Sequence, residues 1–92
     1  MLLRLARTCA QILRNEYGVS EIYLIGSLTR PYPINEHTDI DIMVRGLPDA
    51  VYFRTLKQLY KILPAGVDLD LITMETALPG MLRAGEKEGI KL

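Results

Sequence analysis

Residues 24–27 read Leu-Ile-Gly-Ser and residues 39–44 read Asp-Ile-Asp-Ile-Met-Val, with eleven residues between them. The first stretch is an apolar strand that ends at a glycine, and the second is an apolar strand that carries two carboxylates. Side chains alternate between the two faces of a strand, so Asp39 and Asp41 are expected on one face, about 6–7 Å apart. Two like charges on an apolar strand repel each other. This repulsion costs stability, and a bound divalent cation would remove the cost. A phosphate held by the Gly-Ser step would explain why a cation is bound there.

Length and composition are those of one compact globule, and we expect a single domain over residues 1–92. Apolar residues make up 49% of the chain, which leaves apolar surface for a partner or for self-association as a homo- or hetero-oligomer. No apolar run approaches the roughly 20 residues that cross a bilayer, and no signal-peptide pattern opens the chain, so no membrane contact is expected. The single Cys9 excludes an internal disulfide, which agrees with a cytoplasmic location.

The charge balance argues against a long nucleic-acid partner. Eleven basic residues balance eleven acidic ones. Binding a polynucleotide requires the neutralisation of many phosphates, and this chain has no basic block for that purpose. A single nucleotide carried by a metal ion remains compatible with the composition.

Hydrophobic periodicity predicts an α/β (α+β) fold in the order helix, strand, strand, helix, strand, helix, in which helices cover a small mixed sheet. The first helix starts near Leu2 and stops at Gly18. The predicted strands are residues 19–25, 39–45 and 67–72, and the predicted later helices are residues 49–63 and a segment that Thr73 caps and that runs to the late eighties.

Both later helices have a predicted inner face. In the second helix it consists of Val51, Phe53, Leu56, Leu59, Tyr60 and Leu63. In the last helix it consists of Leu78, Met81 and Leu82. Glycines at 80, 85 and 89 are expected to weaken the last helix, each by up to about 1 kcal/mol relative to alanine. We therefore expect the C-terminal segment to fray unless something packs on it.

A second acidic pair lies on the third predicted strand, at Asp68 and Asp70. Strand interiors are depleted in aspartate, so four acids on two short strands are unlike ordinary surface charge. For Asp39 and Asp41 the alternative is a solvent-facing edge strand with two scattered charges. Asp68 or Asp70 can complete a metal cluster with Asp39 and Asp41 and accept a proton from an attacking hydroxyl. Alternation alone does not choose between Asp68 and Asp70.

Other candidates surround the Gly-Ser step. Gly26 allows close backbone approach to a phosphate, and Ser27 adds a hydroxyl donor at the start of a single helical turn. Arg30 is placed to reach a triphosphate, with a plain surface arginine as the alternative. His37, in the following loop, is expected to be solvated rather than a ligand. Cys9 falls on the inner stripe of the first helix and is expected in the core.

Taken in order, these motifs resemble the nucleotidyltransferase fold of the DNA polymerase beta superfamily, and within it the minimal nucleotidyltransferases (MNT) of prokaryotes. The resemblance runs over nearly the whole chain. It implies that Asp39, Asp41 and Asp70 hold metal, with two Mg²⁺ ions, because the family's third acid precedes an aliphatic pair and a threonine. It also implies that Gly26, Ser27 and Arg30 bind the triphosphate of ATP or another nucleotide.

Many such small proteins look like antitoxins paired with a HEPN-domain toxin, and some transfer AMP from ATP to a tyrosine of that toxin. The resemblance therefore implies a Mg²⁺-dependent nucleotidyltransferase that modifies a hydroxyl of a HEPN partner. Two alternatives remain open at this point. One is an antitoxin that neutralises its partner by binding alone, and the other is a transferase for a small molecule such as an antibiotic.

Overall fold

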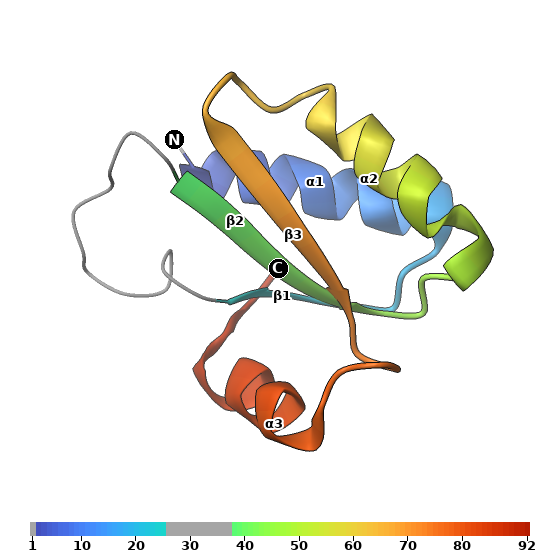
Figure 1. The fold of residues 1–92 in the computed structure, drawn as a ribbon, viewed down its shortest axis with the longest axis vertical. Helices are drawn as coiled ribbons and strands as arrows, with labels where there is room; N and C mark the ends of the chain where they lie inside the picture. The colour runs from blue at the N-terminus through green and yellow to red at the C-terminus, as the bar shows by residue number, and fades with distance from the viewer. Residues whose placement is uncertain (1, 26–37) are drawn as a thin grey trace.

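The computed structural model describes residues 2–25 and 38–92, apart from the side chains of Leu2, Thr38 and Asp39. Residues 1 and 26–37 lie outside this description. The elements, in chain order, are α1 (Leu2–Tyr17), β1 (Glu21–Ile25), β2 (Thr38–Arg45), the short 3₁₀ helix η2 (Asp49–Val51), α2 (Tyr52–Tyr60), β3 (Val67–Thr73), α3 (Pro79–Glu88) and β4 (Ile90–Lys91) (Figure 1).

The strands form one mixed sheet in the order β3-β2-β1-β4. β1 is antiparallel to both β2 and β4, whereas β2 and β3 run parallel. The predicted fold class and element order are therefore confirmed, with β4 as an addition. The predicted boundaries are also close, because the observed strands differ from the predicted ones by one or two residues at their ends.

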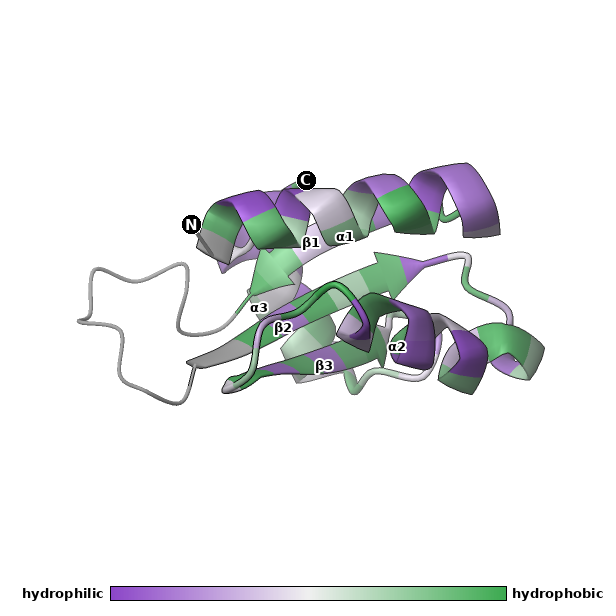
Figure 2. Cartoon of the chain, turned by 90° about the horizontal axis from the view of Figure 1, so that it is seen from above, coloured by the Kyte–Doolittle hydropathy of each residue, from purple (hydrophilic) through white to green (hydrophobic). Residues whose placement is uncertain are grey.

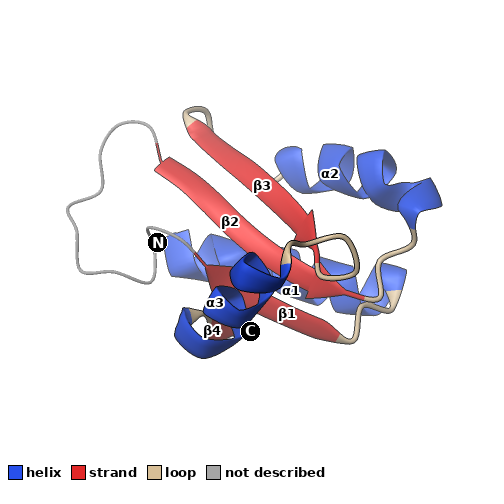
Figure 3. Cartoon of the chain, turned by 60° about the horizontal axis from the view of Figure 1, so that its bottom comes forward, coloured by secondary structure: helices blue, strands red, loops and turns tan. Residues whose placement is uncertain are grey.

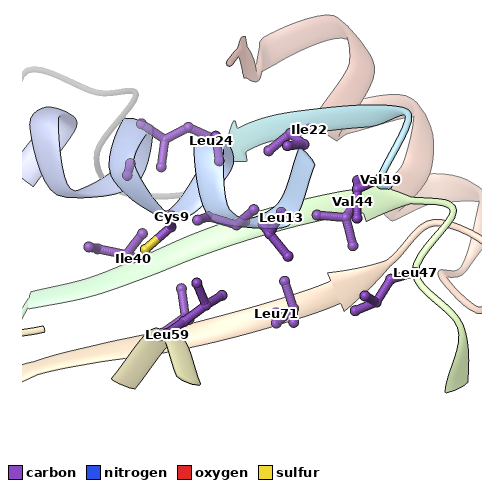
Figure 4. Close-up of a cluster of buried hydrophobic side chains, with 14 residues drawn as sticks. Cys9, Leu13, Val19, Ile22, Leu24, Ile40, Val44, Leu47, Leu59 and Leu71 are labelled. Carbon is purple, nitrogen blue, oxygen red and sulfur yellow. The ribbon is translucent and has the colours of Figure 1, made fainter. Parts of the chain in front are cut away.

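One face of the sheet carries the hydrophobic core. α1 and α2 cover this face, and α3 covers the opposite one, as Figure 3 shows from a second side. Figure 4 shows side chains from α1, α2 and three strands converging between the helices and the sheet. Fully buried members of this cluster include Leu13, Ile22, Leu24, Ile40, Ile42 and Leu59.

The end of α1 follows from its glycine, as predicted. Gly18 has φ +66, a left-handed conformation that glycine adopts without steric cost. The amides of Gly18 and Val19 then donate to the carbonyls of Arg14 and Leu13, both at 3.2 Å. These bonds satisfy carbonyls that the helix end would leave unpaired.

The second helix is shorter than predicted, and its inner face differs from the predicted one at Phe53 and Tyr60, whereas Val51, Leu56, Leu59 and Leu63 pack on the core as predicted. η2 precedes it, and α2 ends at Tyr60 rather than near Leu63. Phe53, predicted to face inward, is 79% exposed. The actual inner positions include Tyr52, Thr55, Leu56 and Leu59, which follow the helical spacing of three and four residues. Phe53 is three residues before Leu56 but lies about 100° around the helix from Tyr52, at the border of this face, so the prediction for it was wrong.

The last helix also starts later than predicted. Thr73 lies buried in β3, where its hydroxyl is 2.6 Å from that of Thr76, so it does not cap α3. α3 begins instead at Pro79, whose fixed φ suits a first helical position. Leu78 and Met81, predicted to face inward, are exposed (74% and 45%), and Leu82 is half-buried.

Glycines, rather than leucines, form the contact of α3 with the sheet. A Cβ on Gly85 would lie 2.3 Å from Cε of Met43, and a Cβ on Gly89 would lie 2.4 Å from the carbonyl oxygen of Gly85. The chain after Gly89 pairs with β1 as β4. The condition under which no fraying was expected is therefore met, because the segment packs on the sheet and these two glycines allow the close approach.

The buried thiol of Cys9 gives a pH-dependent prediction. Burial disfavours the thiolate and raises the pKa of Cys9 from 9.0 to about 11. A raised pKa contributes stability that is present below pH 9 and is lost as the pH rises to about 11. Urea unfolding between pH 8 and 11 should show a steeper loss of stability for the wild type than for Cys9→Ala. A difference between the two proteins that stays constant over this range would contradict the prediction.

Within residues 2–25 and 38–92, no helix has both the length and the apolar character needed to cross a membrane.

Candidate active site

The acidic residues of β2 and β3 lie on the face of the sheet opposite the core. β3 pairs with β2 in a register that sets Asp68 against Asp39 and Asp70 against Asp41. Alternation assigns all four positions to the face that does not carry Ile40, Ile42, Leu69 and Leu71. The third carboxylate predicted on a neighbouring strand is therefore brought beside the first pair, across a strand spacing of about 4.8 Å.

Burial divides this face into an open end and a covered end. Asp68 and Asp70 are exposed, and Asp41 is half-buried. Two positions further along β2, Met43 is completely buried because α3 packs on it at Gly85. α3 thus covers the second half of β2. It leaves the paired positions Asp41 and Asp70 accessible.

Arg45 links three elements at the covered end of the sheet. Arg45 Nε donates to Glu21 Oε2 at 2.5 Å across the β1–β2 pair, and its Nη2 lies 3.7 Å from Glu86 Oε1 of α3. The hydrogen bond from Arg45 to Glu21 raises the pKa of this arginine. The charges of Arg45, Glu21 and Glu86 therefore interact with one another at the end of the sheet away from Asp41 and Asp70.

The predicted phosphate-binding residues Gly26, Ser27 and Arg30, together with His37, lie outside the described residues. The described strands nevertheless show where that segment begins. β1 ends at Ile25, and the Cα partner of Ile25 is Asp41. β1 therefore ends beside the row that contains Asp41 and Asp70.

The donors on this face are hard carboxylate oxygens, which suit Mg²⁺. Among the side chains that the structure describes, no three His, Cys, Asp or Glu residues assemble into a metal site. The side chain of Asp39 is not part of that set. Mg²⁺ usually binds through one or two carboxylates together with substrate phosphates rather than in an all-protein cage. The chemistry of the residues therefore fits this ion.

Two tyrosines of α2 contact β3 on either side of Asp70, and neither was predicted as a site residue from the sequence. Tyr52 donates its hydroxyl to the carbonyl of Leu71, and Tyr60 bonds to the backbone of Leu69. Burial, followed by the charge of Asp70, raises the pKa of Tyr52. The helical spacing of Tyr52 with Leu56 and Leu59 was the signal that placed this tyrosine on the inner face of α2.

No protein-family model matches the sequence, and no curated protein sequence matches it. Solved structures do. A protein assigned to the minimal nucleotidyltransferases superposes with a TM-score of 0.75 at 23% identity, covering 99% of this chain and 93% of that one. The chain has the fold of a minimal nucleotidyltransferase.

Two toxin–antitoxin structures share this nucleotidyltransferase fold. One, solved with AMP-PNP, has a TM-score of 0.74 at 23% identity and covers 94% of this chain and 70% of that one. The other is a variant of the MntA–HpeT toxin–antitoxin with two aspartates, one residue apart, changed to glutamate. It has a TM-score of 0.73 at 20% identity, with the same coverage of 94% and 70%. At this identity the likeness establishes the nucleotidyltransferase fold and its strand order.

Proposed function

We propose that this chain is a Mg²⁺-dependent nucleotidyltransferase that transfers AMP from ATP to a hydroxyl of a HEPN-domain toxin, and that it acts as the antitoxin of that partner. The observation that carries the proposal is the register of β2 and β3, which sets Asp70 directly beside Asp41 on an accessible face. In a nucleotidyltransferase fold, this arrangement suits the binding of metal-bound phosphates.

The roles of the residues follow from their chemistry. Asp39, Asp41 and Asp70 would hold Mg²⁺, which when bound supplies positive charge to the phosphate oxygens. Gly26, Ser27 and Arg30 would bind the triphosphate through backbone amides, a hydroxyl and a guanidinium. Asp70 would also accept the proton of the attacking hydroxyl, for which a carboxylate on an exposed strand is suitable.

The proposed reaction balances without a further reactant. The acceptor's hydroxyl oxygen forms a bond to the α-phosphorus of ATP, and the bond between that phosphorus and the oxygen bridging to the β-phosphorus breaks. Pyrophosphate leaves with the electron pair of the broken bond. The hydroxyl proton passes to Asp70 and then to solvent. The product is an AMP ester of the acceptor.

Two observations favour a protein acceptor. Asp68 and Asp70 are exposed and Asp41 is half-buried, so an acceptor hydroxyl can be presented to this face by a second protein. Apolar side chains are also exposed on the side of the sheet that α3 covers, at Leu78 and Met81. Figure 2 colours the chain by hydropathy and shows hydrophobic and hydrophilic residues alternating along β3. Two of the similar structures are toxin–antitoxin structures, one of them with a bound nucleotide analogue.

The proposal is tested by incubating the protein with ATP labelled at the α-phosphate, Mg²⁺ and the purified product of the neighbouring gene as the proposed partner. We expect label on the partner and a loss of its toxicity. The control is the double variant Asp39→Asn with Asp41→Asn, which keeps side-chain size and removes both charges. Absence of label transfer by the wild type, or transfer that the double variant does not reduce, would overturn the proposal.

The same experiment separates catalysis from neutralisation by binding alone, for which the exposed Leu78 and Met81 are the supporting observation. If the double variant neutralises the toxin as well as the wild type does, binding is the mechanism. If neutralisation is lost together with label transfer while the two proteins still form a complex, modification is the mechanism.

A further inference from the structure

Among the residues that the structure describes, β3 is an outer strand of the sheet, and no further strand pairs with its outer side. In a strand, the N–H and C=O groups of successive residues point alternately to the two sides within the plane of the sheet. An outer strand therefore presents every second residue to the outside, where its polar groups bind water or another chain. The residues on each side of Asp70 are of this outward kind.

α2 satisfies these outward groups with two tyrosine hydroxyls. Tyr60 Oη accepts from the amide of Leu69 at 2.9 Å and lies 3.2 Å from the carbonyl oxygen of the same residue, to which it donates. Tyr52 donates its hydroxyl to the carbonyl of Leu71. Figure 1 shows α2 running alongside β3 on the side away from β2. Both hydroxyls thus take the place that a further strand would occupy.

Asp70 lies between the two anchored residues. Its own partner in the sheet is Asp41 of β2. β3 is therefore held on one side by its pairing with β2, and on the other side by the tyrosine hydroxyls that bond to Leu69 and Leu71. The position of the Asp70 carboxylate relative to Asp41 depends on both attachments, because an outer strand held on one side only can slide or bend away from the sheet.

We propose that Tyr52 and Tyr60 are positioning residues that hold Asp70 in register with Asp41, and thereby set the affinity of the acidic face for Mg²⁺. The inference rests on the proposed function, which assigns Asp70 to the metal. It extends that function by naming two residues of α2 that touch neither metal nor nucleotide. Groups that orient metal ligands in this way change metal affinity when they are removed.

The test uses Tyr52→Phe and Tyr60→Phe, which keep the half-buried ring of Tyr52 and the exposed ring of Tyr60 and remove only the hydroxyls. Mg²⁺ is titrated calorimetrically onto the full chain in the presence of α,β-methylene ATP, which does not release AMP. We expect the dissociation constant for Mg²⁺ to rise about tenfold in each variant. Amide hydrogen exchange at Leu69 should become about tenfold faster in Tyr60→Phe, which loses that bond, and stay unchanged in Tyr52→Phe.

Tyr17→Phe is the matched control. Its hydroxyl also makes a hydrogen bond that involves α2, to Gln58, but it has no contact with β3 in the described hydrogen bonds. Its Mg²⁺ affinity should equal that of the wild type. If Tyr52→Phe and Tyr60→Phe also bind Mg²⁺ like the wild type, the tyrosines only close the edge of the sheet, and the inference is overturned.

Asp70→Asn separates this inference from the proposed function. If Asp70→Asn weakens Mg²⁺ binding and the tyrosine variants do not, the inference alone fails. If Asp70→Asn leaves Mg²⁺ binding unchanged, the assignment of Asp70 in the proposed function fails and the inference falls with it. Weaker binding in all three variants, with the Tyr17→Phe control unchanged, supports both.

Discussion

Asp70→Asn is expected to lower nucleotidyl transfer by about 10²–10⁴-fold, the range for removing a positioned general base. Asp70 is paired with Asp41 at the level where β1 ends, and it carries both a metal-binding and a proton-accepting role in the proposed function. Asn has nearly the same shape but can neither accept the proton as a base nor supply the negative charge. The measurement is the initial rate of label transfer from ATP at saturating Mg²⁺.

Asp68→Asn is the matched control for this variant. Asp68 lies on the same strand and the same face, is also exposed, and is paired with Asp39 instead. We expect its rate to stay close to that of the wild type. The reverse result, with Asp68→Asn inactive and Asp70→Asn active, would assign the third carboxylate to Asp68 and contradict the assignment made from the motif.

Stability should change in the opposite direction from activity. Like charges on directly opposite residues of neighbouring strands destabilise a sheet, each pair by roughly 0.2–1 kcal/mol. Asp70→Asn removes one such charge, so its free energy of unfolding should be equal to or higher than that of the wild type. A gain in stability with a loss of activity is the pattern of a functional residue, whereas a structural residue would lose both.

Gly89→Ala is expected to destabilise the protein by about 1–3 kcal/mol, the usual cost of forcing an extra methyl into a packed site. The new Cβ would lie 2.4 Å from the carbonyl oxygen of Gly85 and 3.2 Å from that of Leu24. Both atoms are backbone, so the contact is relieved only by moving α3 or β1. We expect β4 to lose its pairing with β1, and urea unfolding with amide exchange at Tyr23 and Leu24 would measure both effects.

Gly80→Ala, in the same helix, provides the control. A Cβ at Gly80 has nothing within 4 Å, so alanine gains helix propensity without a contact and should raise stability by up to about 1 kcal/mol. Gly85→Ala should fall between the two, because the nearest atom is the flexible end of Met43. Equal effects of Gly80→Ala and Gly89→Ala would show that the close approach of α3 is not needed.

The sequence predicted the strands and the acidic face because their signals are local. Alternation puts Asp39 with Asp41 and Asp68 with Asp70 on common faces without knowledge of any neighbour. The stop at Gly18 follows equally from one residue that adopts a left-handed conformation. The helix itself was predicted correctly to the late eighties, but its predicted inner face was wrong at Leu78 and Met81, because apolar residues were taken as the packing face. In the structure, Gly85 and Gly89 lie against the sheet, and the need for a residue without a side chain at these positions arises from strands that are distant in sequence.

Sequence alone therefore determined which residues are acidic, which face of each strand they share, and the order of helices and strands. Only the tertiary structure decided that β3 is parallel to β2 in the register that pairs Asp70 with Asp41. It also decided that α2 closes the outer edge of β3 with Tyr52 and Tyr60. The physical reason is that periodicity specifies the direction of a side chain relative to its own backbone, whereas register and edge contacts depend on packing between segments far apart in the chain.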